Sequence, residues 1–182
     1  MSYKKWVFIA IFLFGIGMVF GLATPLSIVN LMSGEIAALE ELSRILAPFS
    51  VLTVILIFIK NVSALVLSFV LSPILCLVPV LALVVNGWLL AFISSAVVQE
   101  KSLGFVLAGL LPHGIFELPA LIMGQAAALS FGTMTILALL QKRKRNLLLP
   151  NLKHNLRYLL IALALLLPAA IIETYITPLL LT

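Results

Sequence analysis

The residues with the greatest capacity for chemistry are one histidine and two glutamates that stand inside long apolar stretches. His113 and Glu117 are four residues apart, and Glu173 lies in a separate apolar stretch near the C-terminus. Residues four apart on a helix share a face, with Cβ atoms about 6 Å apart. Imidazole nitrogens and carboxylate oxygens are both zinc ligands. We therefore predict that His113, Glu117 and Glu173 form one site able to hold zinc or another divalent cation.

Three further polar residues in neighbouring apolar stretches are expected at a similar depth: Lys60, Asn61 and Asn86. An ionisable group at the centre of a bilayer costs at least about 2.5 kcal/mol, so such groups face the bundle interior. We expect these three side chains to surround the metal-site residues. His154 lies in a basic segment and Cys76 in an apolar run, and neither is predicted to be a ligand.

The same polar residues permit two other interpretations. In the first, Glu117 and Glu173 pair with Lys60 and His113 in a cluster that fixes the register of the helices and binds nothing. In the second, the carboxylates belong to a proton or ion pathway and change partner between two states. His-x-x-x-Glu alone is a weak motif, so the sequence leaves all three interpretations open.

The apolar stretches themselves identify the fold class. Of the 182 residues, 64% are hydrophobic and 9% charged, and the mean hydropathy is +1.31, whereas soluble domains carry about 25% charged residues. A spanning helix needs about 20 apolar residues, because lipid offers its backbone no hydrogen-bond partner. The sequence predicts an all-α integral membrane protein, one domain over residues 1–182, with five spans at residues 6–29, 49–71, 73–98, 102–140 and 158–181.

Two segments depart from a simple span. Residues 33–47 place apolar side chains on one face and charged side chains on the others, which predicts a short amphipathic helix on the membrane surface. Residues 102–140 would form a helix of about 58 Å, far longer than the ~30 Å of hydrocarbon. Pro112 lacks an N–H and disfavours helix at Leu111, so we predict a break at residues 111–112.

Basic residues are unevenly distributed between the two membrane faces. Five crossings place Lys4, Lys5, four residues at 142–145, Lys153 and Arg157 on one side with no acid, and most of the acids on the other. Cytoplasmic loops carry the excess of Lys and Arg. We therefore predict a multi-pass protein of the cell membrane with a cytoplasmic N-terminus and an external C-terminus. The same rule explains the net charge of +5, so no nucleic-acid partner is expected.

Small residues recur at every fourth position in two spans. They are Gly17 and Gly21 in the first span, and Ala120, Gly124, Ala128 and Gly132 in the fourth. Such spacing lets two helices approach closely. The neighbouring helix can belong to this chain or to a second copy, and we expect a homo-oligomer, a dimer in the first instance.

Residues 110–120 read Leu-Leu-Pro-His-Gly-Ile-Phe-Glu-Leu-Pro-Ala. This segment resembles the stage II sporulation protein M family, whose hallmark is Leu-Pro-His-Gly followed by Glu-Leu-Pro-Ala. Further agreement lies at Lys60-Asn61, Asn86-Gly87, Ile172-Glu173 and Thr177-Pro178. The resemblance implies a multi-spanning, self-associating membrane protein. In spore-forming bacteria the member that gives the family its name is similar in role to a scaffold that localises cell-wall hydrolases.

The expected function is that of a non-enzymatic membrane scaffold or assembly protein with an intramembrane polar, metal-binding site. Its expected partners are the lipid bilayer, further copies of itself, and other membrane or cell-envelope proteins. One alternative is an intramembrane metal-dependent hydrolase, which requires an open metal position and a path for water. The other alternative is a small ion or solute transporter.

The charge asymmetry makes a testable prediction about orientation. With Cys76 replaced, a cysteine introduced near Glu40 should react with a membrane-impermeant thiol reagent from outside the cell. A cysteine near Lys144 should react only after the membrane is opened. The reverse pattern of labelling would contradict the predicted five-span topology.

Overall fold

The computed structural model describes residues 2–25 and 48–181, which form helices joined by short turns. Five helical segments in these ranges are long and apolar enough to cross a membrane. They comprise α1 (Tyr3–Ala23), α4 (Val51–Leu71), α5 (Leu77–Glu100), α6 (Leu103–Leu140) and α7 (Leu148–Tyr175), the last preceded by η1 (Lys142–Leu147) and followed by α8 (Thr177–Leu180). The all-α, five-span prediction is confirmed, while the predicted surface helix at 33–47 lies outside the described residues.

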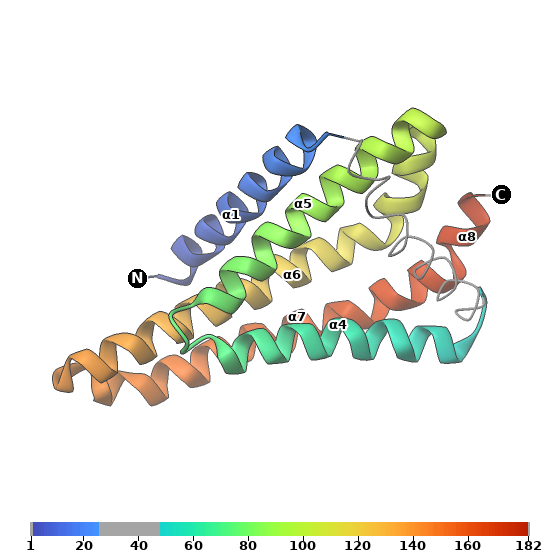
Figure 1. The fold of residues 1–182 in the computed structure, drawn as a ribbon. Helices are drawn as coiled ribbons and strands as arrows, with labels where there is room; N and C mark the ends of the chain where they lie inside the picture. The colour runs from blue at the N-terminus through green and yellow to red at the C-terminus, as the bar shows by residue number, and fades with distance from the viewer. Residues whose placement is uncertain (1, 26–47, 182) are drawn as a thin grey trace.

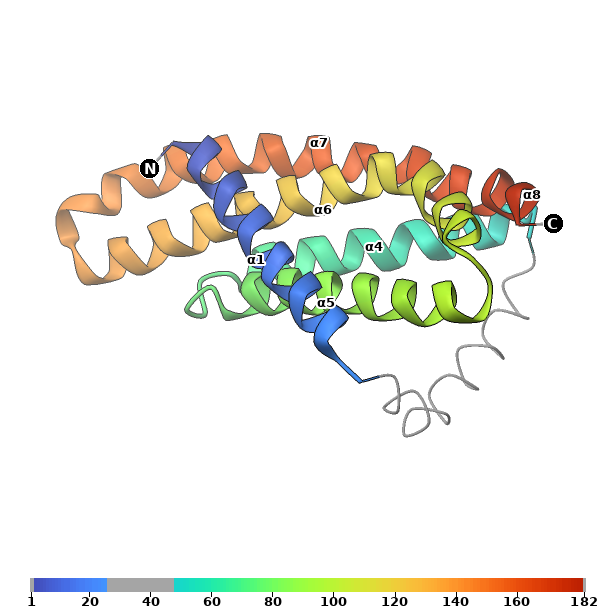
Figure 2. The same cartoon turned by 90° about the horizontal axis from the view of Figure 1, so that it is seen from above.

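Helix α6 is the central element of the bundle. It contacts α1, α4, α5, α7 and α8. In Figure 1, α1 lies along α5 on one side of α6, and α4 lies beside α7 on the other. Seen from above in Figure 2, α1 crosses over α5 obliquely, and the described ends of the chain lie at opposite ends of the bundle. Every other spanning helix is therefore positioned against α6 or against a helix that packs on it.

The helix ends near the predicted site have identifiable causes. Helix α6 begins after Ser102, whose side chain accepts a hydrogen bond from the Phe105 N–H at 3.1 Å as an N-cap. Helix α7 ends at Tyr175, because Pro178 has no N–H to donate to the Thr174 carbonyl four residues earlier. The Phe49 N–H, just before α4, donates to the Thr174 carbonyl at 3.3 Å. This bond fixes the start of α4 beside the end of α7.

The predicted break at residues 111–112 is wrong. The structure has one helix over Leu103–Leu140, with Pro112 and Pro119 inside it. In Figures 1 and 2, the first turns of α6 run at a steep angle to the rest, so the helix bends instead of ending. A proline removes one backbone hydrogen bond and crowds the preceding turn, which kinks a helix. A complete break would leave several N–H groups unpaired in lipid, where no water can satisfy them.

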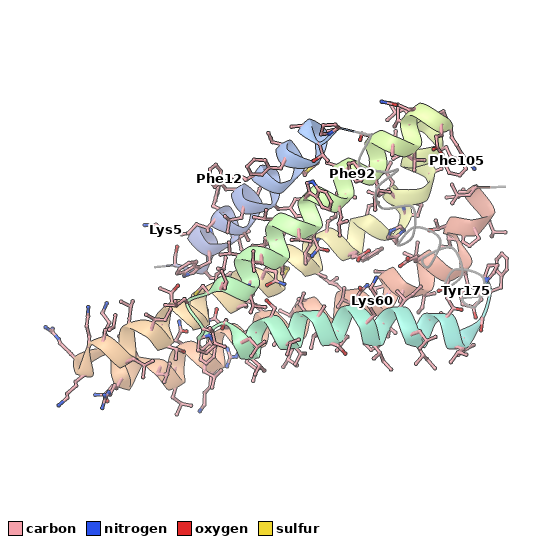
Figure 3. The ribbon with its side chains drawn as sticks, in the orientation of Figure 1. Lys5, Phe12, Lys60, Phe92, Phe105 and Tyr175 are labelled. Atoms are coloured by element: carbon pink, nitrogen blue, oxygen red, sulfur yellow. The ribbon has the colours of Figure 1, made fainter. Side chains whose placement is uncertain are left out.

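Helices α6 and α7 form a hairpin that extends beyond the ends of α1, α4 and α5 (Figures 1 and 2). Helix also replaces most of the predicted loop before residue 158, since η1 and the first turns of α7 occupy that stretch. Figure 3 shows the nitrogen atoms of basic side chains around the hairpin tip, with Lys5 towards the same end and Phe105 and Tyr175 at the other. Most of the described basic residues thus gather at one end of the bundle, with Lys60 and Lys101 as exceptions.

The small residues predicted to mediate close helix packing are all buried within one chain. An added Cβ would overlap the Val84 carbonyl at Gly17 and the Trp88 carbonyl at Gly21, both on α5. At Gly124 it would overlap the Leu65 side chain of α4. These close approaches lie between helices of the same chain. Homo-oligomerisation stays a prediction, and the buried small residues do not support it.

Candidate metal centre

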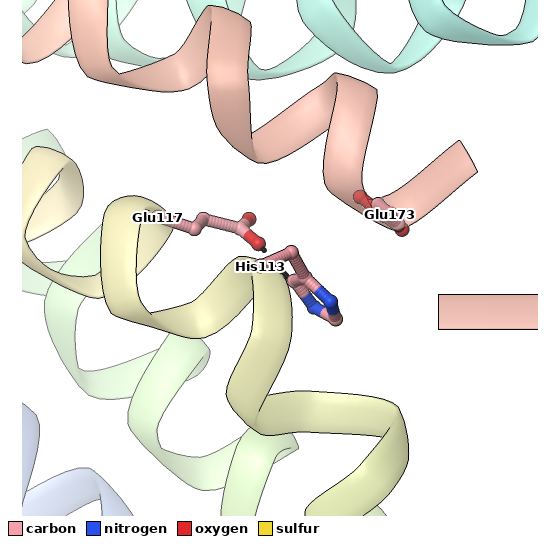
Figure 4. A group of neighbouring side chains, drawn as sticks. All are labelled: His113, Glu117 and Glu173. Atoms are coloured by element: carbon pink, nitrogen blue, oxygen red, sulfur yellow. Dashed lines mark ion pairs between the residues drawn. The ribbon is translucent and has the colours of Figure 1, made fainter. Parts of the chain in front are cut away.

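Three predicted ligand residues come together at the bend of α6. His113, Glu117 and Glu173 each offer one ligand atom, and these atoms lie within 4.8 Å of one another. Figure 4 shows His113 and Glu117 projecting from α6 towards Glu173 on α7. Two residues are therefore supplied by one face of one helix, and the third by the last turn of another.

The elements that carry the ligands explain why they meet. His113 and Glu117 are four apart on α6, and His113 Nε2 lies 3.8 Å from Glu117 Oε2. Glu173 lies two residues before the end of α7, where Pro178 stops the helix and the chain turns into α8. The C-terminal carbonyls of α7 carry a partial negative charge, which favours a cation at this end of the helix.

His113 is oriented by a hydroxyl group on α8. Its Nδ1 lies 3.4 Å from Thr177 Oγ1, and this hydroxyl donates to the Ile172 carbonyl at 3.4 Å. Because the hydroxyl hydrogen is directed to Ile172, the hydroxyl oxygen accepts a hydrogen bond from Nδ1–H. We assign the Nδ1–H tautomer on this basis, which leaves the lone pair of Nε2 free to bind a metal.

Glu117 is held from the opposite side by α4. Asn61 Nδ2 donates to Glu117 Oε1 at 3.4 Å, while Oε2 faces His113. One carboxylate oxygen is thus engaged by an amide, and the other is directed to the shared site. The side chains of His113 and Glu117 are 17% and 35% exposed, so the centre is partly enclosed.

The other two residues predicted to surround the site are Lys60 and Asn86. Within the described ranges, no ion pair shorter than 4.0 Å joins Lys60 to a carboxylate. Lys60 is exposed, and it directly precedes Asn61, about 100° away around the helix. Asn86 donates to the Ala82 carbonyl of its own helix at 2.7 Å, and it lines a cavity together with Glu117.

The three side chains can serve as metal ligands after a small contraction. Ligand atoms in a tetrahedral zinc site lie about 3.4 Å apart, since each bond is about 2.0 to 2.2 Å long. Separations of up to 4.8 Å would therefore close by at most about 1.4 Å, which rotation of the carboxylate side chains can supply. With three protein ligands, one tetrahedral position is left for water or another oxygen.

Two polar features of the site were not predicted from the sequence. Thr177 belongs to the family pattern Thr177-Pro178, and a hydroxyl residue before a proline is its only local signal. Gln125 is 2% exposed and accepts a hydrogen bond of 2.6 Å from Ser68 of α4. Gln125 and Glu117 both line a cavity of about 80 Å³, together with Asn61 and Asn86. The polar region therefore extends from the metal-site residues into the bundle.

His154, which lies in α7, and Cys76 lie apart from this centre. His154 is exposed and makes edge contacts with the rings of Tyr3 and Tyr158. Cys76 is buried, with its thiol 3.7 Å from the Leu129 carbonyl. Neither side chain belongs to the metal-ligand group in the described part of the chain.

One of the comparisons with known proteins identifies a family. A family model described as stage II sporulation protein M matches residues 7–178. A protein of Methanocaldococcus jannaschii named uncharacterized protein MJ0793 is 35% identical over 97 residues, which are 53% of this chain and 54% of that protein. The chain thus spans about half the length of this curated relative. No solved structure matches.

The contact between Thr177 and His113 predicts a specific loss of zinc affinity. Thr177→Val keeps the shape of the side chain but removes the acceptor for Nδ1–H, and it should weaken zinc binding about 10-fold to 100-fold. Thr177→Ser should restore most of the affinity. Thr174→Val is the matched control, because the Thr174 hydroxyl bonds to the Ala170 carbonyl and not to His113. Competition against a chromophoric chelator measures the affinity, and equal values for the two valine variants would contradict the assigned role.

Proposed function

Because the chain belongs to the stage II sporulation protein M family, we propose that it is a non-enzymatic membrane assembly protein with a divalent-cation site within its helical bundle. Zinc is the preferred cation, and His113, Glu117 and Glu173 are its ligands. In this proposal the cation joins α6 to the end of α7 and fixes a surface for other membrane or cell-envelope proteins. The N-terminus is cytoplasmic, on the side where the basic residues gather.

One observation carries the metal proposal: two carboxylates and an imidazole from two helices lie within 4.8 Å of one another. Carboxylates held this close repel each other, and the repulsion is strong where the dielectric constant is low. A divalent cation would compensate both charges at once. The imidazole, with its Nδ1–H committed to Thr177, would add a neutral nitrogen ligand.

The choice of zinc rests on the kinds of donor atom. Calcium and magnesium prefer shells of six or more oxygen ligands or water, whereas an imidazole with two carboxylates in four-coordinate geometry suits zinc. The arrangement connects the bent start of α6 to the last turn of α7. Cation binding would therefore stabilise the bundle at the end where α6 has few buried residues.

A second candidate function, metal-dependent hydrolysis within the membrane, is favoured by the space beside the ligands. A cavity of about 230 Å³ is lined by both His113 and Glu117. An open coordination position next to a cavity can hold a water molecule that the metal activates. In liposomes analysed by mass spectrometry, cleavage that requires both zinc and His113 would establish this activity. If the lipids and peptides in this assay stay intact, hydrolysis is excluded for them and membrane assembly remains the proposed function.

The assembly proposal predicts metal content and metal-dependent stability. The purified chain should bind one zinc per molecule, and His113→Ala or Glu173→Gln should abolish binding. His154→Ala is the matched control, since His154 is the other histidine and lies outside the centre. Zinc at 100 times its Kd should stabilise the fold by about 2.7 kcal/mol. The midpoint of thermal unfolding in detergent should rise accordingly in the parent and not in His113→Ala.

Elemental analysis and thermal unfolding measure these two quantities. A parent chain that takes up no zinc after reconstitution would remove the metal site from the proposal. Equal zinc content in His113→Ala and His154→Ala would show that the cation is bound elsewhere.

A further inference from the structure

The cavity beside the candidate metal centre has two chemically different parts. It lies between α1, α5 and α6 and measures about 230 Å³. Its walls are mainly hydrophobic, with Phe14, Leu90, Ile93 and Leu118 among them, and its polar groups include His113, Glu117 and Asn86. For comparison, an apolar cavity of about 150 Å³ is large enough to bind benzene. The space therefore suits an amphiphile with a hydrocarbon part and an oxygen-bearing part.

A second hollow continues the cavity towards the turn between α5 and α6. It shares Leu90, Ser94 and Leu110 with the first, and it extends along the two helices to Val98 and Leu103. Its exposed surface is almost entirely apolar. Since these helices span the membrane, this hollow faces hydrocarbon. A molecule already dissolved in the bilayer can reach the metal-site residues along it without passing through water.

We propose that the cavity binds a membrane lipid, with its hydrocarbon chain inside and the polar linkage of its head group at His113 and Glu117. The chain would lie against Phe14 and Leu118, and the remaining hydrocarbon of the lipid would extend along the apolar outer hollow. This inference rests on the proposed metal centre, whose open coordination position would accept an ester or phosphate oxygen of the lipid.

The dimensions and chemistry of the cavity favour a lipid over other occupants. A helix from a second copy is about 10 Å across, and a single turn of it would exceed the available space. An extended peptide would carry N–H and C=O groups into a mainly apolar chamber, where few partners could satisfy them. A lipid chain has no such groups, and its one polar region matches the one polar side of the cavity.

Photo-crosslinking provides the test. The zinc-loaded chain is placed in vesicles of phosphatidylethanolamine and phosphatidylglycerol that contain a phospholipid with a diazirine in one acyl chain. Crosslinks should concentrate on the cavity walls of α5 and α6. Gly114→Leu should lower their yield by about tenfold, because the new side chain fills the space that the lipid chain needs. A Cβ at Gly114 meets only Leu110 and Leu118 at 3.8 and 4.0 Å, so the helix can accept it.

Two further variants control for folding and for non-specific lipid contact. Ser94→Leu fills the same cavity from α5 and should give the same loss. Gly15→Leu introduces the same residue on α1 at a position with no neighbour within 4 Å, and it should leave the yield unchanged.

The outcomes separate the lipid site from the metal site. A chain that holds zinc but is crosslinked equally in the parent, Gly114→Leu and Ser94→Leu would overturn the lipid inference alone. A chain that holds no zinc, yet loses its cavity crosslinks in both filling variants, would overturn the proposed metal centre and retain a lipid-chain site.

Discussion

Inside a bilayer, a polar group can be satisfied only by other parts of the protein, and the structure around His113 follows from this constraint. Glu117 accepts a hydrogen bond from Asn61, and His113 is bonded to Thr177, whose hydroxyl donates to the Ile172 carbonyl. Three helices and the short α8 are connected in this way. The carboxylates lie together because the partners available to each at this depth are the same few groups.

The packing of α6 explains why the polar centre lies where it does. Small residues fill its second half, where Ala126, Ala127 and Ala128 are fully buried and Gly124 and Gly132 admit neighbouring helices closely. Dispersion contacts of this kind hold helices together in lipid, where the hydrophobic effect between them is absent. The first half of α6 bends and has few buried residues. That looser half leaves room for the cavity and carries His113 and Glu117.

Sequence reasoning predicts the parts that depend on one-dimensional patterns and on the cost of buried charge. Apolar length predicts the five spans, and the expense of Glu117 and Glu173 in lipid predicts that they lie together. Prediction from the sequence fails where contacts between residues far apart in the chain determine the structure. Pro112 bends α6 because a break would expose backbone groups to lipid. Thr177 and Gln125 acquire their roles from partners more than 50 residues away, which no local signal reveals.

X-ray absorption at the zinc K edge of the purified chain in lipid tests the metal centre most directly. The spectrum should show one imidazole and otherwise oxygen neighbours, at about 2.0 to 2.2 Å from the metal. The imidazole contribution should be absent from His113→Ala. A sulfur neighbour at about 2.3 Å, which would indicate Cys76, or an imidazole signal that survives in His113→Ala, would contradict a centre formed by His113, Glu117 and Glu173.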